Sequence, residues 1–128
     1  MSVQYVNPAT MAAPRGYSHV VKDGNTVYIA GQVARDKDGK TVGVGDAKAQ
    51  VEQVFKNLEA CLASVGGNLS HVVKTNVFMT HREDIQAYRE TRAKYLPSDK
   101  PPTSTLVLCS GLADPDFLVE IEAIAVLP

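Results

Sequence analysis

The clearest pattern along the chain is a stripe of apolar positions between residues 46 and 65. They follow the i, i+3, i+4, i+7 spacing of a helix with one apolar face and comprise Val51, Val54, Phe55, Leu58, Cys61, Leu62 and Val65. Asp46 is placed to cap the start of this helix, and Gly66 with Gly67 supplies the glycine of a left-handed C-terminal cap. The pattern predicts a helix over residues 46–65 that covers a flat apolar surface.

Runs rich in β-branched and aromatic residues predict strands on both sides of that helix. Residues 17–33 predict a hairpin, because the turn at 22–25 contains Asp, Gly and Asn, which tolerate positive φ. Further strands are expected near 4–7 and over 72–79, 103–109 and 117–127.

A second helix is predicted over residues 80–96. Thr80 and Glu83 have the spacing of a capping box, in which each side chain bonds the other residue's backbone N–H. One face of the helix is apolar, with Ile85, Tyr88, Tyr95 and Leu96 on it. Pro97 ends the helix because proline lacks the N–H that a helix interior needs.

The order of elements is therefore (β)ββαβαββ, which predicts an α+β fold with one mixed sheet and both helices on one face. The final strand is apolar on both faces, since Val119, Ile121 and Ala123 alternate with a set that includes Ile124 and Val126. Helices on one side can cover only one of these faces. We therefore expect the second face to be buried against other subunits of an oligomer.

Composition and charge narrow the class of function. The chain has 128 residues, which predicts a single domain over 1–128. Its 13 Lys and Arg and 14 Asp and Glu give a net charge of -1, and the basic residues are scattered. This distribution argues against nucleic-acid binding, which needs a basic stripe to neutralise phosphates.

The location expected from the sequence is the reducing cytoplasm. No apolar segment approaches the length of a membrane span, and the N-terminal residues lack the pattern of a secretory signal. Cys61 and Cys109 lie far apart in apolar stretches, where two buried free thiols are expected. The three histidines are well separated, so no metal site is predicted.

Three stretches of the chain resemble the RidA/YjgF family of reactive-intermediate deaminases, also called the endoribonuclease L-PSP family. They are Tyr28-Ile-Ala-Gly-Gln32, Lys74-Thr-Asn-Val-Phe78 and Leu118-Val-Glu-Ile-Glu-Ala-Ile-Ala125. The resemblance implies a homotrimer of chorismate-mutase-like subunits, with small-molecule clefts at the subunit interfaces and no cofactor or metal. It also implies hydrolysis of enamines or imines, such as 2-aminoacrylate, to a keto acid and ammonia.

The resemblance also assigns residues to the cleft. Catalytic positions match Tyr17 and Glu120, and substrate-binding positions match Ala30, Gly31, Arg89 and Thr103. At position 103 the family has an arginine that binds the substrate carboxylate, in a Pro-Ala-Arg-Ser pattern. Here Thr103 stands in its place, and Thr105 replaces the cysteine usual two residues later.

These residue types suit the implied chemistry. A glutamate on an apolar strand is a candidate for activating water, because partial burial raises a carboxyl pKa. Tyr17 can orient the substrate through its hydroxyl. Thr103 offers at most one neutral hydrogen bond in place of a charged, bidentate pair, so the substrate is expected to differ from 2-aminoacrylate. Arg89 is the first candidate to replace the missing arginine and Arg15 the second.

Three functions remain open at this stage. The first is a hydrolase for an enamine, imine or related unstable carbonyl compound. The second is a trimer that binds a metabolite without catalysis, which the replacement at Thr103 makes a serious alternative. The third, less favoured by the balanced charge, is an endoribonuclease or translation inhibitor.

Overall fold

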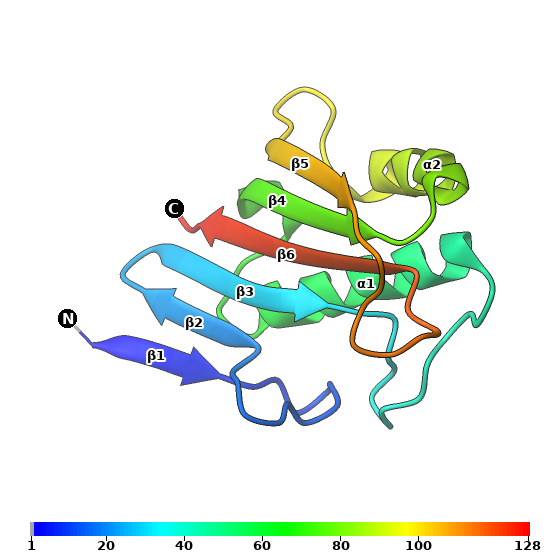
Figure 1. The fold of residues 1–128 in the computed structure, drawn as a ribbon. Coiled ribbons are helices and arrows are strands. Elements are labelled where there is room, and N and C mark those ends of the chain that lie inside the picture. Colours follow the sequence, from blue (N-terminus) through cyan, green and yellow to red (C-terminus); the bar gives the residue numbers. More distant parts are fainter. Residues whose placement is uncertain (1) are drawn as a thin grey trace.

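One mixed sheet of six strands forms the centre of the computed structural model, which describes residues 2–128 (Figure 1). The strands lie in the order β1-β2-β3-β6-β4-β5 and comprise β1 Val3–Val6, β2 Val20–Asp23, β3 Thr26–Gln32, β4 Val72–Met79, β5 Thr103–Leu108 and β6 Val119–Val126. Only β4 and β5 pair in parallel. The predicted order of elements and the α+β class are confirmed.

The first helix, α1 (Ala47–Ala63), forms as its pattern predicts. The Asp46 side chain accepts a hydrogen bond from the Ala49 amide at 3.1 Å and so caps the helix. Past the other end, Gly66 has a φ of 80° and the Gly67 amide donates to the Leu62 carbonyl at 2.8 Å. The apolar face packs on β3 and β6 and contributes six residues to the core.

The second helix, α2 (Ile85–Tyr95), begins later than predicted, and the predicted capping box is wrong. The Thr80 amide donates to the Leu118 carbonyl at 3.3 Å, so the Glu83 side chain cannot take that amide, and the Thr80 hydroxyl lies 2.8 Å from the His81 Nδ1. A 3₁₀ turn, η2 (Arg82–Asp84), intervenes without a side-chain cap. A capping box forms instead at Asn68 and His71, around the 3₁₀ turn η1 (Leu69–His71).

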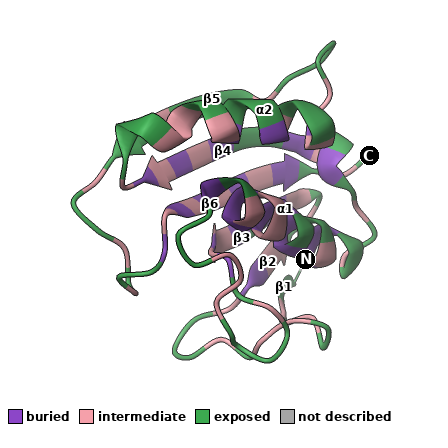
Figure 2. Ribbon diagram, turned by 90° about the vertical axis from the view of Figure 1, so that its right-hand side faces the viewer, coloured by how far each residue is buried: buried purple, intermediate pink, exposed green. Residues whose placement is uncertain are grey.

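The two faces of the sheet differ in what covers them. Both helices lie on one face (Figures 1 and 2), where alternate residues of β6 from Val119 to Ala125 are buried. The opposite face carries Glu120, Glu122, Ile124 and Val126 of β6 and is called the open face below. Large apolar side chains remain exposed there, among them Tyr5 at 70%, Tyr28 at 48% and Val126 at 44%. The predicted apolar character of both faces is therefore confirmed.

Among residues 2–128, no helix is long and apolar enough to cross a membrane. Both cysteines are free thiols, Cys61 buried and Cys109 half-buried, so the prediction of full burial is wrong for Cys109. Cys109 lies just past the end of the edge strand β5, where one side of the chain has no neighbouring strand to cover it.

Candidate functional site

A β-bulge in β3 creates the floor of the candidate site. Ile29 pairs with Ala123 and Gln32 with Ile121, so β3 advances three residues while β6 advances two. The extra residue shifts the alternation, and Gln32 returns to the buried side. The backbone of Ala30 and Gly31 is thereby left beside the side chain of Glu120.

Gly31 makes room for the Glu120 carboxyl. A Cβ at position 31 would come within 2.8 Å of the Glu120 Cδ, closer than real Cβ contacts come. Any residue with a side chain would therefore displace the carboxyl from its place against the bulge. Close packing here is the physical reason for glycine at this position.

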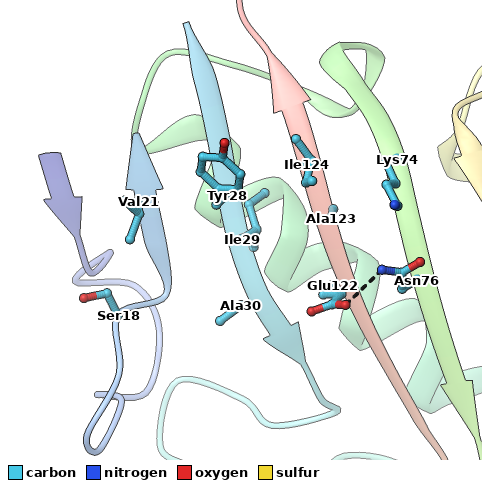
Figure 3. A pocket seen from close by; sticks show the side chains of 10 residues that line it. All are labelled: Ser18, Val21, Tyr28, Ile29, Ala30, Lys74, Asn76, Glu122, Ala123 and Ile124. Atoms are coloured by element: carbon cyan, nitrogen blue, oxygen red, sulfur yellow. Dashed lines mark hydrogen bonds between the residues drawn. The ribbon is translucent and has the colours of Figure 1, made fainter. Parts of the chain in front are cut away.

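The two glutamates of β6 have different surroundings. Burial raises the pKa of the Glu120 carboxyl above its ordinary value, and the neighbouring Glu122 carboxylate raises it further. Glu122 accepts a hydrogen bond from the Asn76 side-chain amide at 3.0 Å (Figure 3). The raised pKa keeps the Glu120 carboxyl protonated to a higher pH than a free glutamate, which suits it to proton transfer.

Four of the six predicted site residues border one cleft of about 610 Å³. They are Tyr17, Ala30, Gly31 and Glu120. They come from three segments, namely the loop before β2, the bulge in β3 and the strand β6. A second hollow of about 370 Å³, on the open face, shares Ala30 and Glu122 with the cleft (Figure 3).

A buried histidine positions the loop that carries Tyr17. Tyr17 lies in a bend three residues before β2, not at the start of the strand as predicted, since the chain turns at Gly16 with a φ of 80°. Its ring meets the His19 ring edge-on at 5.7 Å. The His19 Nε2 lies 2.8 Å from the Ala12 carbonyl oxygen, and its Nδ1 lies 3.3 Å from the Gln32 amide nitrogen.

Gln32 completes this connection because its amide also donates to the Ala30 carbonyl at 3.0 Å. His19 and Gln32 thus join the Tyr17 loop to the bulge. Sequence reasoning missed both residues in this role. Their closeness in sequence to predicted site residues could have indicated this role, since His19 follows Tyr17 by two residues and Gln32 follows Gly31 directly.

The other two predicted residues lie elsewhere in the chain. Thr103 begins the edge strand β5, and its hydroxyl donates to the Val73 carbonyl at 3.1 Å. Arg89 is exposed on α2, on the helix-covered side of the sheet. A single chain therefore brings neither residue to the cleft that Glu120 borders.

Two arginines do border that cleft, Arg15 and Arg35. Arg15 was the second candidate to replace the missing arginine, whereas Arg35 was not considered because it falls in a polar turn of the sequence. The Arg35 guanidinium carbon lies 5.0 Å from the centre of the Phe117 ring. This distance is within the range of a cation–π contact.

Two buried amides of α1 hold the loops around the cleft. The Gln50 amide donates to the carbonyls of Gly43 and Asp116, and its oxygen accepts from the Leu118 amide, at 2.8–3.1 Å. The Asn57 amide donates to two further loop carbonyls, both at 3.0 Å. Sequence reasoning missed this pair. The sequence does carry a signal for it, because two polar residues seven positions apart lie on the same side of the helix, beside the apolar stripe.

The groups presented by the cleft are two half-buried carboxyls, those of Glu120 and Glu122, with a phenol and two guanidiniums. They can transfer protons, donate hydrogen bonds and bind an anion. Elsewhere among residues 2–128, no three His, Cys, Asp or Glu side chains gather in a group that could hold a metal ion.

Comparison with known proteins gives consistent matches over nearly the whole chain. The family model described as endoribonuclease L-PSP matches residues 8–127. A RutC family protein of Pyrococcus horikoshii is 38% identical over 109 residues, and the protein named 3-aminoacrylate deaminase RutC of Acinetobacter baylyi is 32% identical over 109 residues; each match covers 85% of both chains.

Solved structures agree with these matches. RidA from an Antarctic Psychrobacter species superposes with a TM-score of 0.90 at 35% identity, covering 97% of this chain and 99% of that one. Yeast Mmf1 superposes with a TM-score of 0.91 at 29% identity, covering 99% and 100%.

Proposed function

The chain belongs to the endoribonuclease L-PSP family, as its resemblance to RidA proteins predicts, and from this we propose that it hydrolyses a small enamine or imine to a carbonyl compound and ammonia. The observation that carries the proposal is the Glu120 carboxyl, packed against Gly31 in a cleft that Tyr17 also borders. Burial raises its pKa, as acid–base chemistry near neutral pH requires.

The proposed reaction uses Glu120 first as an acid and then as a base. The protonated carboxyl gives its proton to the enamine carbon, which forms an iminium ion. The resulting carboxylate takes a proton from water as the water oxygen bonds to the iminium carbon. The carbinolamine then loses ammonia as the C–N bond breaks, with the hydroxyl proton passing through Glu120 to nitrogen, so the sum is enamine plus water to ketone plus ammonia.

Tyr17 contributes orientation in this scheme. Its side chain is 53% exposed at the edge of the cleft, and its ring is held against His19. A phenol in this position can donate a hydrogen bond to a substrate oxygen or to the attacking water.

We propose that the working form is a homotrimer whose clefts lie between subunits, in the cytoplasm. The exposed apolar side chains on the open face support a subunit interface, because monomers rarely leave such a surface uncovered. Thr103 and Arg89 belong to the proposed site only in such an assembly, where a neighbouring subunit would supply them.

Ammonia release tests the proposal directly. The wild-type protein is expected to accelerate ammonia release from 2-imino acids generated in the assay by an amino acid oxidase. Glu120→Gln keeps the size of the side chain but removes its proton chemistry, and is expected to lose at least 100-fold in rate. Glu59→Gln, an exposed change on α1, serves as the matched control. A wild-type protein that is inert beside an active RidA control would refute the hydrolase.

A metabolite-binding trimer without catalysis is the second candidate. One observation favours it: the Thr103 hydroxyl already donates to the Val73 carbonyl, so its proton is not available to a substrate carboxylate. Thr103→Arg distinguishes the two functions. A gain in imine hydrolysis would support a hydrolase whose site is otherwise competent, whereas an inert variant that remains trimeric would support the binding protein.

RNA cleavage, which the family description names, is the least favoured function because the charge is balanced. Contact with RNA phosphates would release counterions and give a steep salt dependence. We expect negligible binding of single-stranded RNA, with no salt dependence, in a filter-binding assay.

A further inference from the structure

The guanidinium of Arg35 lies over an aromatic ring in the cleft that the proposed catalytic carboxyl also borders. The ring belongs to Phe117, which is only 2% exposed and therefore fixed by the core around it. A guanidinium that stacks on a ring contacts it with its flat face. Its N–H groups point outward in the plane of the guanidinium and can donate hydrogen bonds to other groups. Phe117, Arg35 and Glu120 border the same cleft.

The backbone of Arg35 is fixed as well. Its carbonyl accepts a hydrogen bond from the buried Asn57 amide at 3.0 Å, and its own amide donates to the Val33 carbonyl at 2.8 Å. Arg35 also forms an isolated antiparallel bridge with Thr41. Less conformational freedom is therefore lost when this side chain binds a ligand than when a freely moving arginine does so.

The two arginines that the sequence offered for this role are less well placed than Arg35. Arg15 borders the cleft and, like Arg35, is exposed, but it lies next to Gly16, whose φ of 80° marks a bend. Arg89 lies on the helix-covered side of the sheet. Of these three arginines, Arg35 alone combines a fixed backbone, an aromatic support and a position beside Glu120.

We propose that Arg35 forms a carboxylate-binding subsite in this cleft, so that the ligand is a small acid whose carboxylate meets Arg35 while its carbon–nitrogen double bond faces Glu120. The placement of the double bond toward Glu120 rests on the proposed function. A planar carboxylate can accept two parallel hydrogen bonds from one guanidinium, which also fixes its orientation. The subsite makes an arginine at position 103 unnecessary.

Two carboxyls border this cleft besides Arg35, those of Glu120 and Glu122. Each would repel the ligand's carboxylate when ionised, and the Arg35 guanidinium offsets that repulsion. Burial and Glu122 both shift Glu120 toward its neutral form. The protonated form of Glu120 is also the one that donates a proton in the proposed reaction.

Binding of stable ligands tests the subsite apart from turnover. We would titrate the wild-type protein calorimetrically with 2-oxobutanoate and with 2-oxobutanamide, which lacks the negative charge. The acid is expected to bind more tightly than the amide. Arg35→Ala is expected to weaken binding of the acid by about 10- to 100-fold and leave the amide unchanged. Lys37→Ala, an exposed cation of the same turn, is the matched control.

The outcomes separate the subsite from the reaction. Ammonia release by the wild-type protein together with equal binding of the acid to Arg35→Ala would overturn the subsite and leave the hydrolase standing. If binding of the acid depends on Arg35 but the protein has no hydrolase activity, the subsite is supported and the hydrolase is overturned. Loss of binding in Arg15→Ala but not in Arg35→Ala, or no binding of either ligand to the wild-type protein, would also overturn the subsite. Thermal unfolding checks that each variant is folded.

Discussion

Glu120 and Glu122 occupy the same face of one strand, yet their surroundings give them different roles. Asn76 donates a hydrogen bond to Glu122, while Glu120 packs against the backbone of Gly31 and is partly removed from water. The charge of Glu122 also makes ionisation of Glu120 less favourable. Two consequences follow at the level of single residues.

The first concerns the dependence of stability on pH. The Glu120 pKa is raised in the folded protein above its ordinary value of 4.5, so the folded state binds this proton more tightly than the unfolded state does. Its contribution to stability is fully present below pH 4.5 and is lost as pH rises through the higher folded-state pKa. As pH rises from 4.5 through the folded-state pKa, the unfolding free energy of the wild type is therefore expected to fall relative to that of Glu120→Gln. Urea unfolding of both proteins between pH 4 and 8 measures this difference.

Glu122→Gln provides the comparison for that experiment. Removing the neighbouring charge leaves only burial to raise the Glu120 pKa. The pH range over which stability is lost should therefore become narrower. A difference between Glu120→Gln and the wild type that stays constant with pH would contradict the raised pKa.

The second consequence concerns Gly31→Ala. The added methyl group would overlap the Glu120 carboxyl and push it away from the bulge. We expect kcat/KM to fall by roughly 10- to 100-fold, since small displacements of catalytic groups have effects of this size. Gly111→Ala is the matched control, because a Cβ there meets no atom within 4 Å. Unchanged kinetics in Gly31→Ala would argue against a catalytic Glu120.

At this scale the sequence predicted the residues of the strands better than those of the loops. Glu120, Ala30 and Gly31 could be placed because they match motifs of the RidA family, and the alternation along β6 agrees with the face on which Glu120 lies. Arg35, His19 and Gln32 could not. Their positions depend on the bulge and on hydrogen bonds between distant segments, which no local pattern reveals.

Among the elements, α1 and α2 show where local signals are sufficient. Asp46 and Gly66 lie at the ends of α1 and act within one turn, so the sequence located this helix to within two residues. Thr80 carries an equally good local signal, but the sheet holds its amide and prevents the cap. Tertiary hydrogen bonding decided the start of α2.

The contact between α2 and the sheet contains buried hydroxyls without partners. Within residues 2–128, the hydroxyls of Thr75 on β4 and of Tyr88 and Thr91 on α2 have no hydrogen-bond partner. Thr75→Val preserves the shape and removes one such group, so we expect the free energy of unfolding to rise by about 1 kcal/mol. Thr103→Val, whose hydroxyl does have a partner, should bring no gain in chemical denaturation. A loss of stability in Thr75→Val would indicate that the hydroxyl is satisfied in solution.

For the whole molecule, the open face is the feature that the sequence predicted and a single chain cannot explain. The alternation in β6 gave apolar residues on both faces, and the structure places Tyr28 and Val126 on the uncovered one. The sequence could predict that this face needs a cover. It could not predict the residues that meet there, because those depend on the relative orientation of two copies.

Sedimentation of a charged variant tests this face. The wild type is expected to have three times the mass of one chain, and Tyr28→Glu is expected to dissociate it, because the new charge would be buried at the interface. Hydrolysis should be lost with the assembly. Lys56→Glu on α1 changes charge on the helix-covered side and should remain trimeric. A monomeric wild type at micromolar concentration would contradict the trimer.

The position of β6 has a consequence for how the protein matures on the ribosome. β6 is synthesised after the other five strands of this sheet, yet it lies between β3 and β4 and carries Glu120. Until it emerges, the segments on either side of it have no strand to join them, and the cleft has no carboxyl. Completion of the sheet and appearance of the catalytic group are therefore a single late event. A nascent chain stalled before β6 should be inert and readily digested by protease.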